Sequence, residues 1–295
     1  MENLNDNNLQ SQILRTITWF DLFSQPLTAW EIYKYLNYPT SYTNIISALE
    51  TLYDKIGFKD GFFFLIGREN IITERFRKYN YFKRKIKKAR IFTKLISLWP
   101  SILGVAVSNI IGDHNLKDSG DIDLLIITKA KRIWSGRFIC TLIAKVLGLR
   151  PNIKTKRDKI CLSFYISSDN LNLEKYLYNE QDFYFVYCLA DLTIVYNYNN
   201  IWSKFYKENI FLKKYLPNNP EPIFNKEDIA DNFKLGLIGS GLEKVLKKFQ
   251  LNIMPQNLKN QVGQSSGVML DDNIIKLFLI DKRPEFINLF NNRIK

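Results

Sequence analysis

Two aspartates separated by one residue, Asp121 and Asp123, are the strongest chemical signal in the sequence. They open the β-branched and leucine-rich run 122–128, which is typical of a buried strand. Residues i and i+2 of a strand point to the same face, so this spacing directs both carboxylates to one place. Neighbouring carboxylates repel one another unless a cation neutralises them. Mg²⁺ suits such a pair because it takes one or two carboxylates and completes its octahedron with water and phosphate oxygens.

A small polar pair, Ser108 and Asn109, ends the apolar run 103–107 upstream of the aspartates, with a short helix or loop expected in between. Two carboxylates beside such a turn can hold two Mg²⁺ ions, one activating an attacking hydroxyl and the other stabilising the leaving pyrophosphate. This pattern predicts a Mg²⁺-dependent nucleotidyltransferase that moves a nucleoside monophosphate from an NTP to a hydroxyl acceptor. Asp121 and Asp123 are then the catalytic metal ligands, and Ser108 and Asn109 form the nucleotide cradle.

Arg137 is a further candidate nucleotide-binding residue, because it lies one turn into the otherwise apolar helix predicted for 134–148. Burying a guanidinium without an anion costs several kcal/mol. Its expected partner is therefore either a nucleotide phosphate or an acidic side chain in a structural salt bridge.

Residues 104–128, in which these motifs lie, resemble the core motif of the polymerase-beta-type nucleotidyltransferase superfamily. Outside this core, the chain resembles a group of uncharacterised bacterial proteins in which a winged helix precedes a minimal nucleotidyltransferase domain. The segments that carry this second likeness are 16–28, Gly67-Arg68-Glu69-Asn70, Trp134 with Arg137, and 214–218. The resemblance implies a fold and a reaction type, with Mg²⁺ and an NTP, and no particular acceptor. Nucleic acid and protein are both open as acceptors.

The first strand departs from the superfamily pattern, which usually has Gly-Ser at its end. Aligned through the acids, this chain has Asn109 and Ile110 there. Asparagine can adopt the left-handed conformation that glycine supplies, but isoleucine cannot replace a hydroxyl. Ser108, one position earlier, is the remaining candidate for that hydroxyl.

A third acid, expected on the later strand 159–166, is also missing. That strand offers only Ser163, and the flanking Asp158 and Asp169 lie outside it. These departures motivate the alternative that the protein is a catalytically degenerate member that keeps the fold as a nucleotide- or nucleic-acid-binding module.

The elements expected to position the site give an α+β protein. Three helices are predicted first: one from near-helical apolar spacing that begins at Gln12, one with Thr28 as N-cap and Glu31 three residues on, and one opened by Ser41 or Thr43. A hairpin around Asp60-Gly61 follows them. Three helices and a hairpin are the order of a winged-helix domain. The predicted units are a winged-helix domain (1–67), a basic connector helix (68–98), a nucleotidyltransferase α/β core with a mixed sheet (99–170) and a helical C-terminal region (171–295), in which 228–251 is expected to be helical and 252–272 a polar loop.

The positive charge is concentrated in the connector. The chain has 42 Lys and Arg against 29 Asp and Glu, a net +13, and the segment from Arg68 to Lys94 alone carries eleven basic and two acidic residues. A solvated helix face and a surface for a polyanion are both compatible with this run. The predicted third helix, roughly 43–53, has no Arg or Lys, which favours docking or substrate placement over base reading in a major groove; a transcription regulator is a third hypothesis.

Composition excludes several classes of protein. An apolar fraction of 46%, with only 13 Gly and 9 Pro, is incompatible with a disordered or collagen-like chain. No apolar run reaches the ~18 residues needed to cross a bilayer, and the acidic opening segment is unlike a secretory signal, so a cytoplasmic protein without a membrane partner is expected. Cys140, Cys161 and Cys188 lie in apolar surroundings, which favours buried free thiols.

Overall fold

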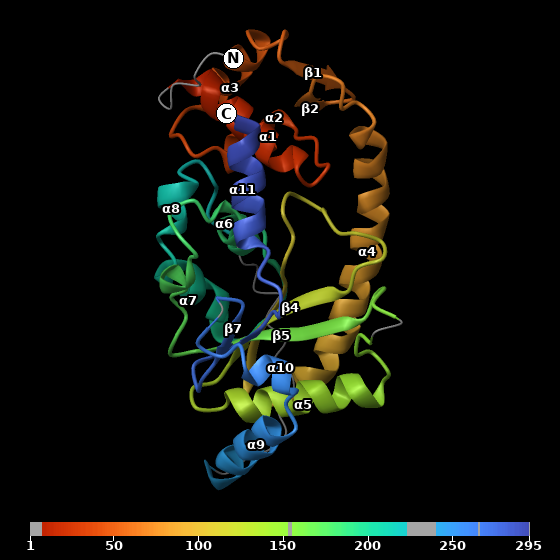
Figure 1. Ribbon diagram of the computed structural model, residues 1–295, viewed down its shortest axis with the longest axis vertical. Coiled ribbons are helices and arrows are strands. Elements are labelled where there is room, and N and C mark those ends of the chain that lie inside the picture. Colours follow the sequence, from red (N-terminus) through yellow and green to blue (C-terminus); the bar gives the residue numbers. More distant parts are fainter. Residues whose placement is uncertain (1–7, 153–154, 223–239, 265, 295) are drawn as a thin grey trace.

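The structure, a computed structural model, describes residues 8–152, 155–222, 240–264 and 266–294. Over these ranges the chain is a mixed α+β protein with eleven α-helices, a six-stranded mixed sheet and a separate two-stranded hairpin (Figure 1). In chain order the helices and strands are α1 (Leu9–Asp21), α2 (Ala29–Tyr35), α3 (Tyr42–Glu50), β1 (Ile56–Lys59), β2 (Phe62–Leu65), α4 (Ile71–Ile96), β3 (Ile102–Val107), β4 (Ile122–Thr128), α5 (Ile133–Val146), β5 (Ile160–Ser167), α6 (Phe183–Ala190), β6 (Thr193–Asn197), α7 (Ile201–Glu208), α8 (Leu212–Tyr215), α9 (Ser240–Asn252), α10 (Gln256–Lys259), β7 (Val268–Leu270), β8 (Ile274–Leu277) and α11 (Arg283–Ile294).

The N-terminal helices and hairpin form where the local signals predict them. Thr28 and Glu31 make the reciprocal capping box at the start of α2, and the Ser41 side chain caps α3. The hairpin turns at Asp60 and Gly61, both with positive φ (53° and 81°), as a tight turn between twisted strands requires. Leu27 adds a backbone bridge to Phe63, so the segment before α2 is tied to the hairpin.

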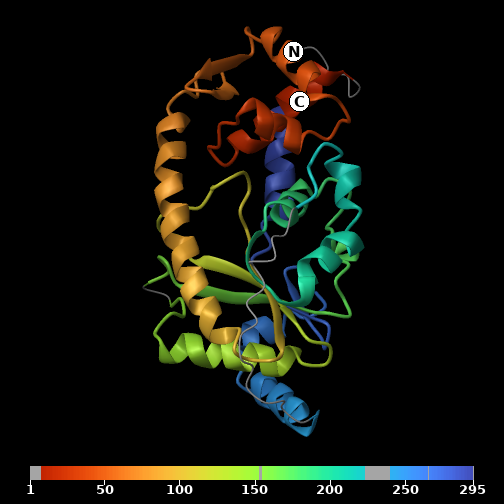
Figure 2. The same ribbon diagram turned by 180° about the vertical axis from the view of Figure 1, so that it is seen from behind.

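α4 is the long helix that runs along one side of the molecule from the hairpin to α5 (Figures 1 and 2), and much of its positive charge is used inside the protein. Arg75 pairs with Glu31 at 2.7 Å, and Lys85 pairs with Asp158 at 2.9 Å. The ammonium of Lys78 donates to two backbone carbonyls just after α1. The basic residues of this helix that are exposed are Arg77, Lys83, Lys87, Lys88, Arg90 and Lys94. The choice between a solvated face and a polyanion surface therefore concerns only these residues.

The six-stranded sheet has the order β6-β3-β4-β5-β8-β7, in which only β4 and β5 are parallel neighbours. The helical prediction for 171–295 is wrong at β6, β7 and β8, since all three strands join this sheet. The stretch 193–197 lies between aromatic helices that mask its short β-branched signal. The predicted loop 252–272 likewise contains α10 and β7, and the predicted helix 228–251 is described only from Ser240 onward.

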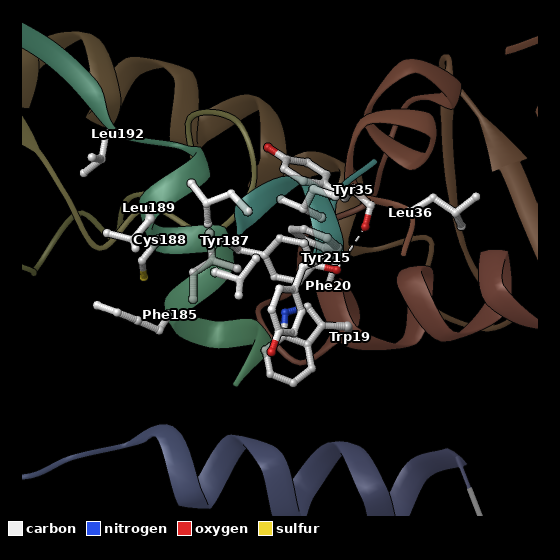
Figure 3. Close-up of a cluster of buried hydrophobic side chains, with 14 of the residues drawn as sticks. Trp19, Phe20, Tyr35, Leu36, Phe185, Tyr187, Cys188, Leu189, Leu192 and Tyr215 are labelled. Atoms are coloured by element: carbon white, nitrogen blue, oxygen red, sulfur yellow. Dashed lines mark hydrogen bonds between the residues drawn. The ribbon is translucent and has the colours of Figure 1, made fainter. Parts of the chain in front are cut away.

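The two faces of the sheet have different cover. One face, with Leu125 and Ile127 of β4, shares a core with the N-terminal helices and with α6 to α8. The other face, with Leu124 and Ile126, packs against α5 and the second half of α4. Figure 3 shows where the first core continues into the N-terminal helices, and there the Phe20 ring lies 5.0 Å from that of Tyr187 on α6. The N-terminal helices thus share a core with the sheet.

No helix within the described ranges combines the length and the apolar character that crossing a membrane requires.

The ion pairs between α4 and Asp158 give a testable prediction about stability. Asp158 is 8% exposed and accepts from Arg84, Lys85 and Lys88, the first two at 2.9 Å and the third at 3.1 Å. Asp158→Asn leaves the fully buried Lys85 without its counter-charge, so we expect a loss of about 3–5 kcal/mol in the free energy of unfolding, measured with urea. The double variant with Lys85→Met should recover most of this loss. Asp118→Asn, at a half-exposed partner of Arg84 and Arg157, should cost no more than about 1 kcal/mol.

The same ion pairs of Asp158 make the stability of the protein depend on pH. Burial opposes ionisation of Asp158, but the three basic hydrogen-bond donors hold its pKa well below the usual value. Because the folded-state pKa is depressed, the stabilisation is complete above the unfolded-state pKa of about 4 and is lost as the pH falls below it. Stability of the wild type should therefore drop more steeply than that of Asp158→Asn on acidification below pH 4; parallel curves would contradict this assignment.

Candidate metal centre

Asp121 and Asp123 lie together at the start of β4, as their spacing predicts. The ligand atoms of both carboxylates and of the Cys161 thiol all lie within 4.8 Å of one another. Asp123 is paired directly with Cys161 across the parallel β4–β5 ladder, which explains how the thiol arrives there. Cys161 therefore occupies the position on the later strand where a third acid was expected.

A β-bulge in β5 shapes this place. Asp123 pairs with Cys161, whereas Leu125 pairs with Phe164, so β5 has one more residue than β4 between the two pairs. The extra residue lets Cys161, Ser163 and Phe164 all line the same pocket, with the Cys161 Sγ 3.2 Å from the Ser163 Oγ. Bulges recur beside functional sites because they redirect side chains in this way.

Asn109 is held between α6 and the Asp123 carboxylate. Its Nδ2 donates to Asp123 Oδ2 at 3.0 Å, and its Oδ1 accepts from the Tyr184 hydroxyl at 2.6 Å. Its φ of +60° confirms the prediction that asparagine adopts the left-handed conformation at this turn. The preceding Ser108 lines the pocket and donates its backbone N–H to the Asp123 carbonyl, while Ile110 is buried in the core. The Asn109 side chain thus orients Asp123, and only its backbone is available as a cradle.

A pocket of about 460 Å³ opens onto the carboxylates. Its floor is the face of the sheet that carries Asp123, α6 covers it, and the chain after β8 forms a wall. Ser108, Asn109, Asp121 and Asp123 all line this pocket, so the structure brings four of the five predicted site residues together.

The fifth, Arg137, lies elsewhere. It belongs to α5, which covers the opposite face of the sheet, and its Nη1 donates to Gln250 Oε1 of α9 at 2.6 Å. Burial lowers the pKa of this guanidinium. The structure therefore does not bring Arg137 to this pocket, because α5 and the pocket lie on opposite faces of the sheet. The partner is an amide, which neither of the two sequence-based alternatives named.

The protonation states at the site follow from its recessed position. Removal from bulk water and then the neighbouring Asp121 raise the pKa of Asp123, although hydrogen bonds from Cys161 and Asn109 oppose the shift. Burial and the Asp123 carboxylate raise the pKa of Cys161 well above that of a free thiol. A divalent cation would relieve the repulsion between the carboxylates. Hard Mg²⁺ prefers oxygen, so the two aspartates fit it and the protonated thiol does not.

No third carboxylate joins the group within 4.8 Å in the part of the chain that the structure describes. Asp158 is bound by the α4 bases. Asp169 lies just past the other end of β5, where it accepts from Ser167.

Two further residues of the pocket, Tyr184 and Lys276, have no clear signal in the sequence. Tyr184 lies in an aromatic-rich stretch, 176–206, whose pattern is typical of a helix core, and only the fold shows that its hydroxyl reaches Asn109. Lys276 lines the pocket from β8; its signal was a single charge inside the apolar run 274–279.

The contact between Tyr184 and Asn109 generates a prediction about metal affinity. Tyr184→Phe removes the donor that fixes the Asn109 amide, and so loosens the hydrogen bond that orients Asp123. Loss of such an outer partner costs about 10- to 100-fold in metal affinity, and we expect the Kd for Mn²⁺, measured by calorimetry, to rise by at least tenfold. Tyr176→Phe is the control, since it removes a tyrosine hydroxyl that lies outside the pocket and accepts from Asn170 Nδ2 at 3.1 Å. Equal Mn²⁺ affinity in the two variants would contradict the positioning role of Tyr184.

Comparison with protein-family models, with curated proteins and with solved structures finds no match to this chain.

Proposed function

We propose that the protein is a Mg²⁺-dependent nucleotidyltransferase that moves a nucleoside monophosphate from an NTP to a hydroxyl acceptor. The observation that supports this most directly is the convergence of Asp121 and Asp123 on one pocket, with their ligand atoms within 4.8 Å of each other. Bound Mg²⁺ would neutralise phosphate charge and stabilise the leaving pyrophosphate. Two carboxylates without a third favour one resident ion over two.

The chain's own residues have distinct roles in this proposal. Asp121 and Asp123 hold the ion, and Asn109 keeps Asp123 in one orientation through the hydrogen bond at 3.0 Å. The backbone of the Ser108–Asn109 turn and the Ser108 hydroxyl contact the phosphates. α6 closes the pocket over the sheet and limits access of water, which would compete with the acceptor for the nucleotide.

For the acceptor, we propose that α1 to α3 and the hairpin act as a winged-helix-type unit for docking or substrate placement. α3 contains no Lys or Arg, which argues against base reading in a groove. The exposed bases of α4, among them Lys83 and Lys87, offer the charge that an anionic acceptor such as RNA requires. An acidic protein segment fits the same surface.

The proposed reaction predicts a strict dependence on the paired carboxylates. Incubation with Mg²⁺ and α-labelled NTPs, with a panel of RNAs, proteins and small hydroxyl compounds, should label an acceptor and release pyrophosphate. The variant Asp121→Asn/Asp123→Asn keeps the side-chain volumes but removes both anionic ligands, so labelling should fall by at least a thousandfold, the range of an essential electrostatic interaction. Labelling that survives in the folded double variant would sink the proposal.

The second candidate, a catalytically degenerate nucleotide- or nucleic-acid-binding module, is favoured by one observation: Cys161 stands where a third acid was expected. Cys161→Asp distinguishes the two functions. A third carboxylate adds both charge and an oxygen ligand, so we expect its Mg²⁺ affinity to increase by about tenfold over the wild type, with Cys161→Ser unchanged. Transfer by the wild type supports the enzyme. Transfer by Cys161→Asp alone, with nucleotide binding by both proteins, identifies the natural chain as the degenerate module.

A further inference from the structure

A buried lysine without a counter-charge lies in the pocket. Lys276 is 4% exposed and lines the pocket from β8. It pairs with Phe164 across the β5–β8 ladder, and Phe164 pairs with Leu125 of β4. Cross-strand partners point to the same face, so Lys276 faces the side of the sheet that carries Asp123.

Its ammonium group has few partners. It donates to the Ser266 carbonyl at 3.1 Å and lies 5.4 Å and 5.9 Å from the ring centres of Phe185 and Phe278. Asp182 and Asp281, the carboxylates that act on it electrostatically, are ion-paired instead with Arg283, at 3.0 Å and 2.6 Å. An ammonium has three N–H donors, so two of them have no acceptor among the described residues.

The other buried lysines of the described chain have more oxygen acceptors than Lys276. Lys85 has the carboxylate of Asp158 and a backbone carbonyl, and Lys78 has three oxygen acceptors around the end of α1. Burying a charge without such partners is costly. Burial lowers the pKa of Lys276 to about 8, as it does that of Lys78, so the difference between the two lysines lies in their hydrogen-bond partners. A cation kept in this state at a pocket wall is suited to an anion that arrives with a ligand.

The position of Lys276 indicates what that ligand must be. β8 lies two strands from β4, about 10 Å across the sheet at the usual strand spacing of 4.8 Å. The aspartates at one end of the pocket require a cation that carries anionic ligands, and Lys276 at the other end requires a second anionic group. A chain of phosphates meets both requirements with one molecule.

We propose that Lys276 binds the terminal phosphates of a nucleoside triphosphate whose α-phosphate end lies at Asp121 and Asp123. This assignment rests on the proposed function, because it takes the nucleotide in this pocket as given. In this role Lys276 favours binding of triphosphates over monophosphates, because a monophosphate at the aspartates leaves the ammonium group unpaired.

The test compares nucleotide affinity by calorimetry in the presence of Mg²⁺, using an ATP analogue that cannot be cleaved between the α- and β-phosphates, and AMP. The wild type should bind the analogue more tightly than AMP. Lys276→Met should lower the affinity for the analogue by about 10- to 100-fold, as expected for the loss of a charge-assisted hydrogen bond, and leave the affinity for AMP unchanged. Lys175→Met, at an exposed lysine outside the pocket, is the matched control.

Folding is not expected to confuse the result, because methionine replaces an uncompensated buried charge with apolar volume, which is often neutral or stabilising. Urea unfolding and Mn²⁺ binding at the aspartates verify that Lys276→Met retains the fold and the metal site. A wild type that binds no Mg²⁺-nucleotide overturns the proposed function and this assignment together. Equal affinity of the wild type and Lys276→Met for the analogue overturns this assignment alone. The assignment is also overturned if Lys276→Met loses binding of an RNA acceptor but keeps its affinity for the analogue.

A pH series adds a readout that a structural role would not move. The free lysine is protonated below about pH 8, so affinity of the wild type for the analogue should fall as the pH rises from 7.5 to 9.5, while that of Lys276→Met stays level. The charged groups that face Lys276 are Arg283, Asp281 and Asp182. Hydrogen bonds and charge hold the pKa of Asp281 low, and burial raises that of the nearby Cys188 thiol well above its usual value. A wild-type affinity that is level over this range contradicts the assignment.

Discussion

The arrangement of the site depends on the hydrogen bonds that converge on the buried carboxylate of Asp191. It accepts hydrogen bonds from Lys34 Nζ at 2.9 Å, Tyr35 Oη at 2.7 Å and the Gly112 N–H at 2.9 Å. These donors belong to α2 and to the loop after β3, while Asp191 directly follows α6. Burial alone lowers the pKa of Lys34, but Asp191 and Asp113 together raise it above its usual value. Since removing one partner leaves the others buried and unpaired, the three segments are held as one unit.

The chemistry of the pocket depends on this unit. Asp191 fixes the end of α6, the same helix presents Tyr184 to Asn109, and Asn109 orients Asp123. Gly112 is required where the loop meets the N-terminal helices: its φ is +84°, and an added Cβ would lie 3.0 Å from a Gln25 side-chain atom. The N-terminal helices are therefore part of the scaffold that sets the geometry of the site. A substitution in α2 can be expected to act on Asp121 and Asp123 although it lies far from them in sequence.

Local signals in the sequence predicted the parts that depend on neighbours in the chain. The strand that carries Asp121 and Asp123, the capping box and the hairpin at Gly61 each need only a few adjacent residues. The β5 bulge, the contact between Tyr184 and Asn109 and the position of Lys276 depend on pairings between distant strands and helices, which periodicity does not encode. The same limit applies to the basic run of α4, whose partner Asp158 lies beyond two further strands and a helix.

Binding and catalysis make separate demands on this pocket. The paired aspartates and Lys276 line the same pocket, and in our proposal they bind one ligand that carries both a chelated cation and a further anionic group. A nucleotidyltransferase and a degenerate binding module have this requirement in common, so affinity for Mg²⁺-NTP does not separate them. In-line transfer further requires activation of the acceptor hydroxyl by a metal ion or a base. Cys161 is the residue at the position where that additional ligand or base was expected. Its protonated thiol is neither a good ligand for hard Mg²⁺ nor a base for the acceptor hydroxyl. The difference between the two proposed functions therefore lies in whether one ion, held by Asp121 and Asp123, would suffice to activate the acceptor.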